Sequence, residues 1–154
     1  MTGEHQVFTP GDNHLTITVN GWRIRTFICY DLRFPIWTRN INNQYDVAVF
    51  IANWPSLRAA QWRLLMPARA VENQCYVIGV NRAGKDGNGL AYSGDSSIID
   101  PLGKILFHQS DTPCIHTERL SYDRIREYRE TFAAWQDADG DAVCFSKLSC
   151  FPGE

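Results

Sequence analysis

The sequence predicts an α/β fold built on mixed β-sheets. Strand and helix patterns alternate in the first half of the chain, strand patterns dominate its middle, and a helical pattern occupies residues 121–131. Alternation of this kind is typical of parallel strands joined through helices, whereas consecutive strands with short turns form antiparallel pairs. The 154 residues suffice for one domain and are too few for two.

The first predicted element is a β-hairpin. Apolar and polar residues alternate over 15–19, Asn20-Gly21 follows, and a second alternating run reaches a strand end at Cys29. Asn-Gly favours a tight hairpin because both residues tolerate the positive φ angles of the turn.

A short helix, a buried strand and a longer helix follow. Pro35 predicts the first turn of a helix that runs to about Asn42. The apolar run 46–52 has the pattern of a parallel strand buried on both faces. Ser56 is predicted to cap a helix that runs to about Gln74. The apolar residues that gather on one side of that helix are Leu57, Leu64, Leu65, Ala68 and Val71.

The second half is predicted to hold further strands and a final helix. The ranges in order are a strand at 76–80, a glycine-rich loop at 84–94, strands at 97–100 and 105–108 joined by a turn, a candidate strand at 114–119, and a helix at 121–131 capped by Ser121. Residues 140–154 show no periodicity and are interpreted as a divergent tail.

Composition excludes several classes of partner. Fifteen Lys and Arg against seventeen Asp and Glu leave no basic field for nucleic acid. The longest apolar stretch, 46–54, is far shorter than the roughly 20 residues that cross a bilayer, and the N-terminus has no signal-like run. Five cysteines without CxxC spacing predict neither disulfides nor a metal site. We therefore expect a cytoplasmic protein without nucleic-acid, membrane or metal partners.

Cys29 lies at the end of a predicted strand, where a sheet holds a side chain and a turn presents it. A thiol in this position acts as a nucleophile if a nearby base or cation makes it a thiolate. Free cysteine is also among the most buried residue types, so a structural role stays open on this pattern alone.

Several motifs surround this cysteine in a specific order. They are Phe27–Pro35 (FICYDLRFP), Ala52–Pro55 (ANWP), Ala68–Val77 (ARAVENQCYV), Val80–Arg82 (VNR) and Asp86–Gly89 (DGNG). Together they resemble the C-terminal half of the nitrilase superfamily of carbon-nitrogen hydrolases, and we expect residues 1–139 to be that portion of the domain. Arg-Phe-Pro at 33–35 and the runs 126–130 and 134–139 resemble the ω-amidase branch, which acts on 2-oxoglutaramate and similar dicarboxylic monoamides.

The resemblance implies a Cys, Lys and Glu triad in a four-layer αββα sandwich that forms a homodimer. Cys29 matches the nucleophile, which attacks the amide carbonyl while the backbone N–H of Tyr30 and a lysine ammonium hold the oxyanion. Ammonia leaves a thioester, and water activated by the glutamate releases the acid. Glu4 resembles a second glutamate that positions substrate and base, although an ordinary exposed glutamate is the alternative. The scheme implies no metal and no organic cofactor.

The chain departs from this family pattern before the cysteine. The family places its glutamate base and its lysine upstream of the nucleophile, whereas Lys85, Lys104 and Lys147 all follow Cys29. We therefore expect Met1 to be an internal methionine of a longer reading frame, and the chain as given to be inactive alone.

Three further residues are candidates for substrate binding. Asn53 and Trp54 follow a buried strand, where α/β folds place ligand contacts. Arg58 suits a substrate carboxylate because guanidinium binds carboxylates in a bidentate manner, although a solvated helix residue is equally consistent. Asp31 and Arg33 either line the cleft or pair with each other. Two functions remain: a small-molecule amidase, or a catalytically silent, truncated nitrilase-like remnant that serves as an interaction module.

Overall fold

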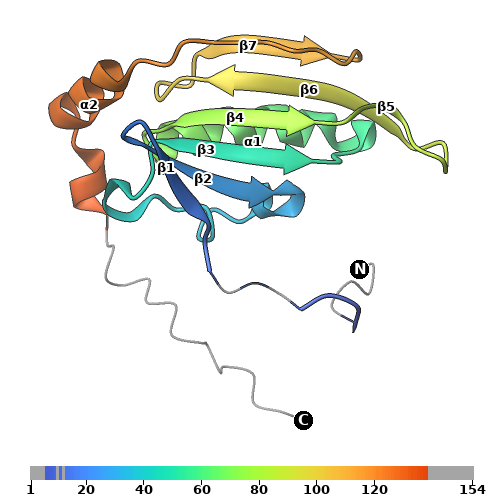
Figure 1. The fold of residues 1–154 in the computed structure, drawn as a ribbon, viewed down its shortest axis with the longest axis horizontal. Coiled ribbons are helices and arrows are strands. Elements are labelled where there is room, and N and C mark those ends of the chain that lie inside the picture. The colour runs from blue at the N-terminus through green and yellow to red at the C-terminus, as the bar shows by residue number, and fades with distance from the viewer. Residues whose placement is uncertain (1–5, 10, 12, 139–154) are drawn as a thin grey trace.

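The computed structural model describes residues 6–9, 11 and 13–138, so Glu4 and the predicted tail lie outside the described residues. Seven strands form one mixed sheet in the order β1-β2-β3-β4-β6-β5, and β7 also pairs with β6 (Figure 1). The strands are β1 Thr16–Val19, β2 Trp22–Ile28, β3 Val47–Ala52, β4 Tyr76–Asn81, β5 Ala83–Lys85, β6 Ala91–Ile99 and β7 Ile105–Ser110. The α-helices are α1 Ala59–Glu72 and α2 Tyr122–Thr131, and the 3₁₀ turns are Cys29–Arg33, Ile41–Asn43, Ser56–Arg58 and Ala134–Asp137. The predicted α/β class with a mixed sheet is confirmed.

The centre of the sheet is parallel. Strands β2, β3 and β4 run in one direction, with Ile28 opposite Ile51 and Ile51 opposite Val80, while β1, β5, β6 and β7 form antiparallel pairs. Because parallel strands end at the same edge, the residues that follow β2, β3 and β4 lie side by side. This edge carries the end of β2, where Cys29 begins a turn.

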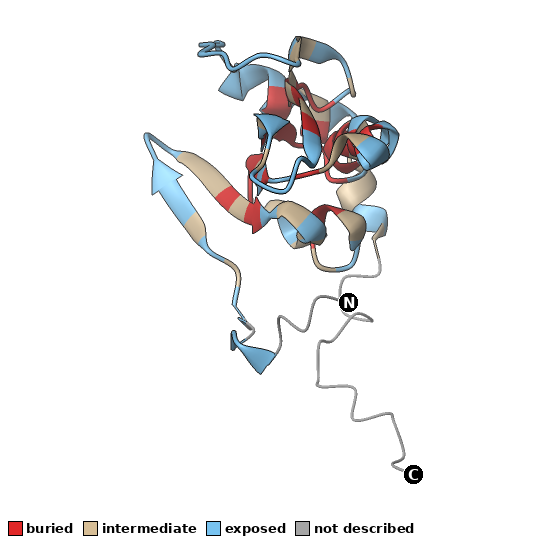
Figure 2. Ribbon diagram, turned by 90° about the vertical axis from the view of Figure 1, so that its right-hand side faces the viewer, coloured by how far each residue is buried: buried red, intermediate tan, exposed pale blue. Residues whose placement is uncertain are grey.

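The predicted hairpin is confirmed. Asn20 and Gly21 have φ angles of 48° and 83°, and Val19 pairs with Trp22 across the two-residue turn. Both turn residues therefore occupy the left-handed region that this turn type requires. The hairpin projects from the sheet, and β1 is exposed along most of its length (Figure 2).

The prediction of a helix from Pro35 to about Asn42 is wrong. The chain makes a hydrogen-bonded turn over residues 35–38, then a 3₁₀ turn in which Asn42 has a φ of 50°. The backbone N–H of Asn40 donates to Asn73 Oδ1 at 2.8 Å instead of to a helical carbonyl. A tertiary hydrogen bond and a left-handed residue thus replace the helical pattern.

Helix α1 begins at Ala59 rather than at a Ser56 cap. Ser56 starts a 3₁₀ turn, and the side chain of the N-terminal flanking residue, Arg58, makes no capping bond. The predicted apolar side faces outward only in part, since Leu57 and Leu64 are 90% and 73% exposed whereas Leu65 packs against the core cluster. The residues of α1 that pack into the core cluster beneath it are Trp62, Met66 and Ala70.

Gly79 of β4 explains why that side of α1 faces the sheet. A Cβ at this position would lie 2.2 Å from Met66 Cε and 2.9 Å from a Trp62 ring carbon. The missing side chain lets two large residues of α1 approach the backbone of the strand, which is a positional reason for a glycine inside a strand. Packing therefore selects the Trp62 and Met66 side of the helix for burial.

The predictions for the second half are partly confirmed. Strands β4, β6 and β7 lie where strand patterns were predicted, and Ser121 caps α2 by accepting a hydrogen bond from Arg124 N at 3.2 Å. The glycine-rich loop is shorter than predicted, because β5 ends at Lys85 and β6 begins at Ala91. Residues 114–119 form no strand.

The two faces of the sheet are covered by different helices and to different extents. Helix α1 covers one face, and α2 packs Ile125 against Val47 and Tyr76 at the amino ends of the strands on the other. Toward the carboxyl ends on that second face, Ile51 and Val80 are 55% and 50% exposed. The prediction that strand 46–52 is buried on both faces is therefore wrong for Ile51, although β3 is parallel to both neighbours as predicted.

A buried carboxylate fastens α2 to the sheet. Asp46 Oδ1 accepts hydrogen bonds from Arg23 Nη2 and Arg129 Nη1, both at 2.7 Å, and its Oδ2 accepts one from Arg23 Nε at 3.0 Å. Arg129 also donates to the carbonyl oxygens of Gln74 and Tyr45. Burial alone raises the pKa of Asp46, but the hydrogen bonds from Arg23 and Arg129 outweigh it and hold that pKa below its usual value.

The free energy of unfolding is expected to depend on pH through Asp46. Its folded-state pKa is lowered, so its contribution is present above the ordinary carboxyl pKa and is lost as pH falls below about 4. Asp46→Asn should lower the free energy of unfolding at pH 7 by about 3 kcal/mol, because it leaves two arginines without their anion. Urea titrations between pH 7 and pH 3 should show a flatter dependence for the variant than for the parent.

The control is Asp123→Asn. Asp123 is exposed and lies 3.5 Å from Arg126, so its loss should change the free energy of unfolding by less than about 0.5 kcal/mol. An equal effect of the two substitutions would contradict the anchoring role of Asp46.

Candidate active site

The Cys29 turn, defined as residues Cys29–Arg33, directly follows the end of β2 at the carboxyl edge of the parallel strands. Cys29 has a φ of 42°, in the left-handed region that costs a non-glycine residue about 1–2 kcal/mol. Asp31 Oδ2 accepts a hydrogen bond from the backbone N–H of Ile28 at 2.8 Å, which closes the turn at its amino end. The sharp reversal places the thiol at the end of the strand.

Cys29 is partly exposed and also packs against the main core cluster. This is the arrangement that a nucleophile at a strand end needs. The alternative prediction for Cys29 is a buried structural cysteine, and in this protein Cys75 is such a residue. Cys75 is fully buried, and burial raises the pKa of its thiol to about 12. Of these two thiols, Cys29 is therefore the one open to chemistry.

Tyr30 and Arg33 follow Cys29 in the same turn. Tyr30 is 60% exposed, and its ring lies 5.2 Å from that of Phe34. The guanidinium of Arg33 donates to Gln61 Oε1 at 2.6 Å and lies 4.8 Å over the ring of Trp54. Arg33 is thus held by an amide and an aromatic face, and neither is an anion.

The predicted residues after β3 lie at the same edge but differ in role. Asn53 is exposed, whereas Trp54 is only 3% exposed. The Trp54 indole N–H donates to the carbonyl oxygen of Arg58 at 2.8 Å, which brings Arg58 beside it. The Arg58 side chain is exposed and makes no ion pair with any of the described residues. The geometry makes Trp54 a support for Arg33, and leaves Asn53 and Arg58 open to solvent.

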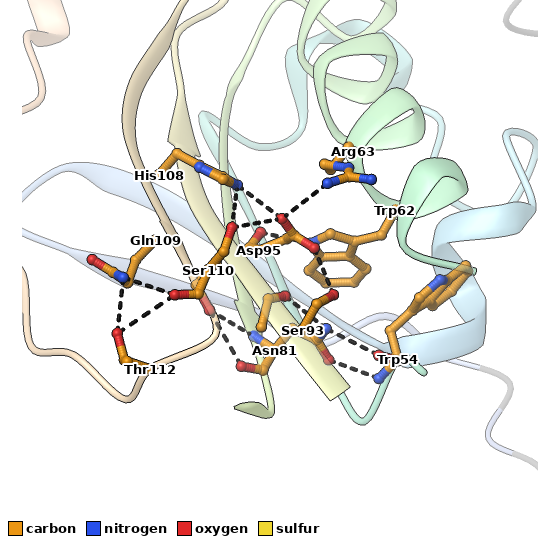
Figure 3. A network of polar contacts seen from close by, with 12 residues as sticks. Trp54, Trp62, Arg63, Asn81, Ser93, Asp95, His108, Gln109, Ser110 and Thr112 are labelled. Atoms are coloured by element: carbon orange, nitrogen blue, oxygen red, sulfur yellow. Dashed lines mark hydrogen bonds and ion pairs between the residues drawn. The ribbon is translucent and has the colours of Figure 1, made fainter. Parts of the chain in front are cut away.

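Asn81 connects the end of β4 to its neighbours on both sides (Figure 3). Its Oδ1 accepts from Trp54 N at 2.7 Å, and its Nδ2 donates to the carbonyl oxygens of Trp54 at 3.2 Å and Gly94 at 2.7 Å. The residue is buried, so these bonds satisfy backbone groups that have no access to water. The loop after β3 is therefore fixed to β4 and β6.

A polar network around Asp95 continues from this point, and sequence patterns do not reveal it. Asp95 is a bulge residue of β6 with a φ of 55°, and its carboxylate accepts hydrogen bonds from Ser93 at 2.6 Å and Ser110 at 2.9 Å and contacts His108 at 3.0 Å (Figure 3). Burial raises the pKa of Asp95, but these bonds outweigh it and hold the pKa below its usual value. Trp62 of α1 donates its indole N–H to the Asp95 carbonyl oxygen at 2.9 Å. The network joins β6 and β7 to α1, the helix that covers one face of the sheet.

A second feature that sequence patterns do not reveal is the hydrogen bonding of Asp86 in the loop between β5 and β6. Asp86 accepts backbone hydrogen bonds from Leu90 and Asn88, both at 2.9 Å, and the hydroxyl of Tyr92 donates to it at 3.1 Å. Burial and the bond to Asp86 raise the pKa of Tyr92, and the charge of Cys29 adds to that rise. The signal in the sequence that could have pointed to Tyr92 was its place inside a glycine-rich segment.

Other features lie apart from this edge. A cavity of about 430 Å³ is lined by Arg23, Asp46 and residues of α2, so it lies at the amino ends of the parallel strands, opposite Cys29. Among the described residues no group of three His, Cys, Asp or Glu is arranged to hold a metal ion. Neither described α-helix has the length and apolar character of a membrane span.

Comparison with known proteins gives consistent matches. The carbon-nitrogen hydrolase family model matches residues 2–130. Omega-amidase YafV of Escherichia coli K12 is 50% identical over 90% of this chain and 54% of its own length, and 2-oxoglutaramate amidase of Bacillus subtilis is 32% identical over 92% and 54%. A CN-hydrolase superfamily protein of Xanthomonas campestris, solved with an arsenic adduct in its active site, is 41% identical with a TM-score of 0.85 over 88% of this chain and 54% of its own. The chain spans about half the length of these relatives.

The left-handed backbone at Cys29 leads to a stability prediction. Cys29→Gly should be more stable than Cys29→Ala by about 1 kcal/mol, because glycine adopts a positive φ without a Cβ clash. Urea denaturation of the two variants measures the difference. The same pair at Cys114, which is not among the described residues with positive φ, should show no advantage for glycine. An equal preference at both positions would contradict strain at Cys29.

Proposed function

Because the chain belongs to the carbon-nitrogen hydrolase family, we propose that it carries the nucleophile of an amidase, with the Cys29 thiol attacking the carbonyl carbon of a small amide. The resemblance to the nitrilase superfamily and its ω-amidase-like branch, which the motifs predicted, is confirmed by the family match and the names of the relatives. The observation that carries the proposal is a partly exposed cysteine on a left-handed turn at the carboxyl edge of parallel strands.

In the proposed reaction the Cys29 thiolate bonds to the carbonyl carbon and the carbonyl electrons move onto oxygen. The backbone N–H of Tyr30 lies in the first turn of a 3₁₀ helix, where amides have no partner within the helix, and it donates to this oxyanion. The tetrahedral intermediate collapses by breaking the carbon-nitrogen bond, and the nitrogen takes a proton and leaves as ammonia. Water then adds to the thioester and gives a proton to a base, which releases the acid and regenerates the thiolate. No cofactor enters the scheme.

The proton transfers need groups that this sequence does not supply at the expected place. No lysine precedes Cys29, and Glu4 is outside the described residues. We therefore propose that the chain alone does not turn over. The same observation favours a second candidate function, a catalytically silent interaction module with the fold of the family.

The proposed substrate class is a dicarboxylic monoamide of the 2-oxoglutaramate type, a small molecule of the cytoplasm. Relatives carry the names omega-amidase and 2-oxoglutaramate amidase. The free carboxylate of such a substrate requires a cation near the nucleophile. Arg33, in the Cys29 turn, is held by Gln61 and Trp54 with no ion pair among the described residues, and exposed Arg58 lies beside Trp54. We propose Arg33 and Arg58 as the carboxylate partners, with Asn53 beside them.

An electrophile that resembles the substrate tests the site without requiring turnover. A chloromethyl ketone with a terminal carboxylate should alkylate Cys29 about tenfold faster than its methyl ester does, because a charge-assisted contact with Arg33 is worth about 1.5–3 kcal/mol. Peptide mass spectrometry measures the label, with exposed Cys114 as the reference thiol in the same chain. Arg33→Gln should remove the preference for the acid.

Two outcomes would count against the proposal. Equal labelling of Cys29 and Cys114 by the acid would remove the case for a substrate site and leave the interaction module. Ammonia release from 2-oxoglutaramate that Cys29→Ala abolishes would support the amidase but overturn the proposed inactivity of the chain alone, since a lysine would have to come from elsewhere.

We also propose that the protein forms a homodimer through the outer side of α1 and of the 3₁₀ turn Ser56–Arg58 that precedes it. Leu57, Leu64 and Val71 recur every seven residues and are 90%, 73% and 47% exposed. A stripe of apolar side chains on one helix is the kind of surface that two copies cover by packing their helices together. The stripe that the sequence predicted as apolar thus has a proposed use outside the core.

Leu64→Arg is expected to shift the dimer to monomer, because a charge at the centre of an apolar interface remains without a partner. Light scattering coupled to size-exclusion chromatography measures the mass. The matched control is Ile115→Arg, since Ile115 is 100% exposed and lies outside α1. A dimer that persists in Leu64→Arg would exclude this interface.

A further inference from the structure

We propose that Arg69 is a positioning residue for the nucleophile, because its guanidinium holds the turn that presents Cys29. The inference rests on the proposed function, since it gives a buried arginine of α1 a part in presenting the thiol. Arg69 is 4% exposed and lies within a motif of the sequence to which the reaction scheme gives no role.

The contact between Arg69 and the turn is direct. Arg69 Nε and Nη2 both donate to the carbonyl oxygen of Leu32, at 3.1 Å and 2.7 Å. Leu32 belongs to the Cys29 turn and is 0% exposed, so its carbonyl has no access to solvent. Hydrogen bonds from a guanidinium are stronger than those from a neutral amide, and two of them onto one oxygen fix both its distance and its direction.

The guanidinium is itself held in place. Arg69 Nη1 donates to Glu72 Oε1 at 2.8 Å, and the Asn73 side-chain amide donates to the Arg69 carbonyl oxygen at 3.0 Å. Glu72 supplies the negative charge that a buried arginine requires. All three nitrogens of the guanidinium are thereby used, so Arg69 cannot leave Leu32 without losing several bonds at once.

The Cys29 turn is therefore held by side-chain hydrogen bonds at both of its ends. Asp31 Oδ2 binds the backbone N–H of Ile28 before Cys29, and Arg69 binds the carbonyl of Leu32 after it. A left-handed non-glycine residue persists only when its surroundings hold it there. The Asp31 contact lies within the turn, whereas the Arg69 contact connects the turn to α1, which packs on the sheet. Arg69 is thus the buried link between the Cys29 turn and α1, in addition to the exposed hydrogen bond of Arg33 to Gln61.

The test measures presentation of the thiol and the mobility of the turn separately. In Arg69→Lys a single ammonium replaces the planar fork, so Cys29 labelling by the carboxylate-bearing chloromethyl ketone, relative to Cys114, should fall about tenfold. Amide hydrogen exchange of the peptide that spans 28–34 should rise in the same variant. If Arg69→Lys does not fold, Glu72→Ala removes the orienting partner alone and should lower the ratio about threefold.

Arg129→Lys is the matched control. Arg129 is also a buried arginine that donates to backbone carbonyls, but it lies at the opposite end of the strands, so its loss should lower the unfolding midpoint and leave the Cys29 to Cys114 ratio within about twofold. An unchanged or increased ratio in Arg69→Lys, or the same fall in Arg129→Lys, would overturn the inference.

The proposed function and the inference fail in different ways. If the parent protein shows no preference for Cys29 over Cys114, the proposed function fails, and the exchange of the 28–34 peptide alone decides whether Arg69 holds the turn. If the parent shows the preference and Arg69→Lys keeps it, only the inference fails.

Discussion

The left-handed backbone at Cys29 is the constraint on which the candidate site depends. A strand that continued past Ile28 would point the next side chain toward one face of the sheet, whereas a positive φ at Cys29 turns the chain at once and leaves the residue at the edge. Because L-residues avoid this conformation, the surroundings must supply the compensating free energy. Asp31 supplies part of it within the turn, and Arg69 supplies part of it from α1.

The parallel centre of the sheet converts that local feature into a site. Strands β2, β3 and β4 end together, so Cys29 has the loop of Asn53 and Trp54 as a neighbour. Asn81 fixes the Trp54 backbone to β4 and β6, and the Asp95 network fixes β6 to α1 through Trp62. Buried polar groups of this kind are costly unless every bond is made, and in return they specify one arrangement of the loop. The rigidity of the edge thus comes from side chains that never meet a substrate.

Helix α1 serves both the interior and the exterior of the protein. One side carries Trp62 and Met66 into the core over Gly79, and the outer side exposes Leu64 and Val71. Apolar residues on both sides explain why periodicity did not select the buried residues correctly, since a helical repeat specifies a stripe but not what covers it. The exposed stripe of α1 and the exposed carboxyl ends of β3 and β4 are two apolar surfaces that the described residues leave uncovered.

Local signals were sufficient where the chain decides its conformation alone. Asn20-Gly21 determined a hairpin turn and Ser121 determined a helix start, because each acts through its own backbone or the next few residues, and the ordered motifs around Cys29 identified the family. Tertiary structure alone decided that residues 35–42 form turns, since Asn40 bonds to Asn73 across the fold. It also decided that Asp95 of β6 bonds to His108 and Ser110 of β7. Such contacts join residues far apart in the sequence, and their free energy exists only once the strands are paired.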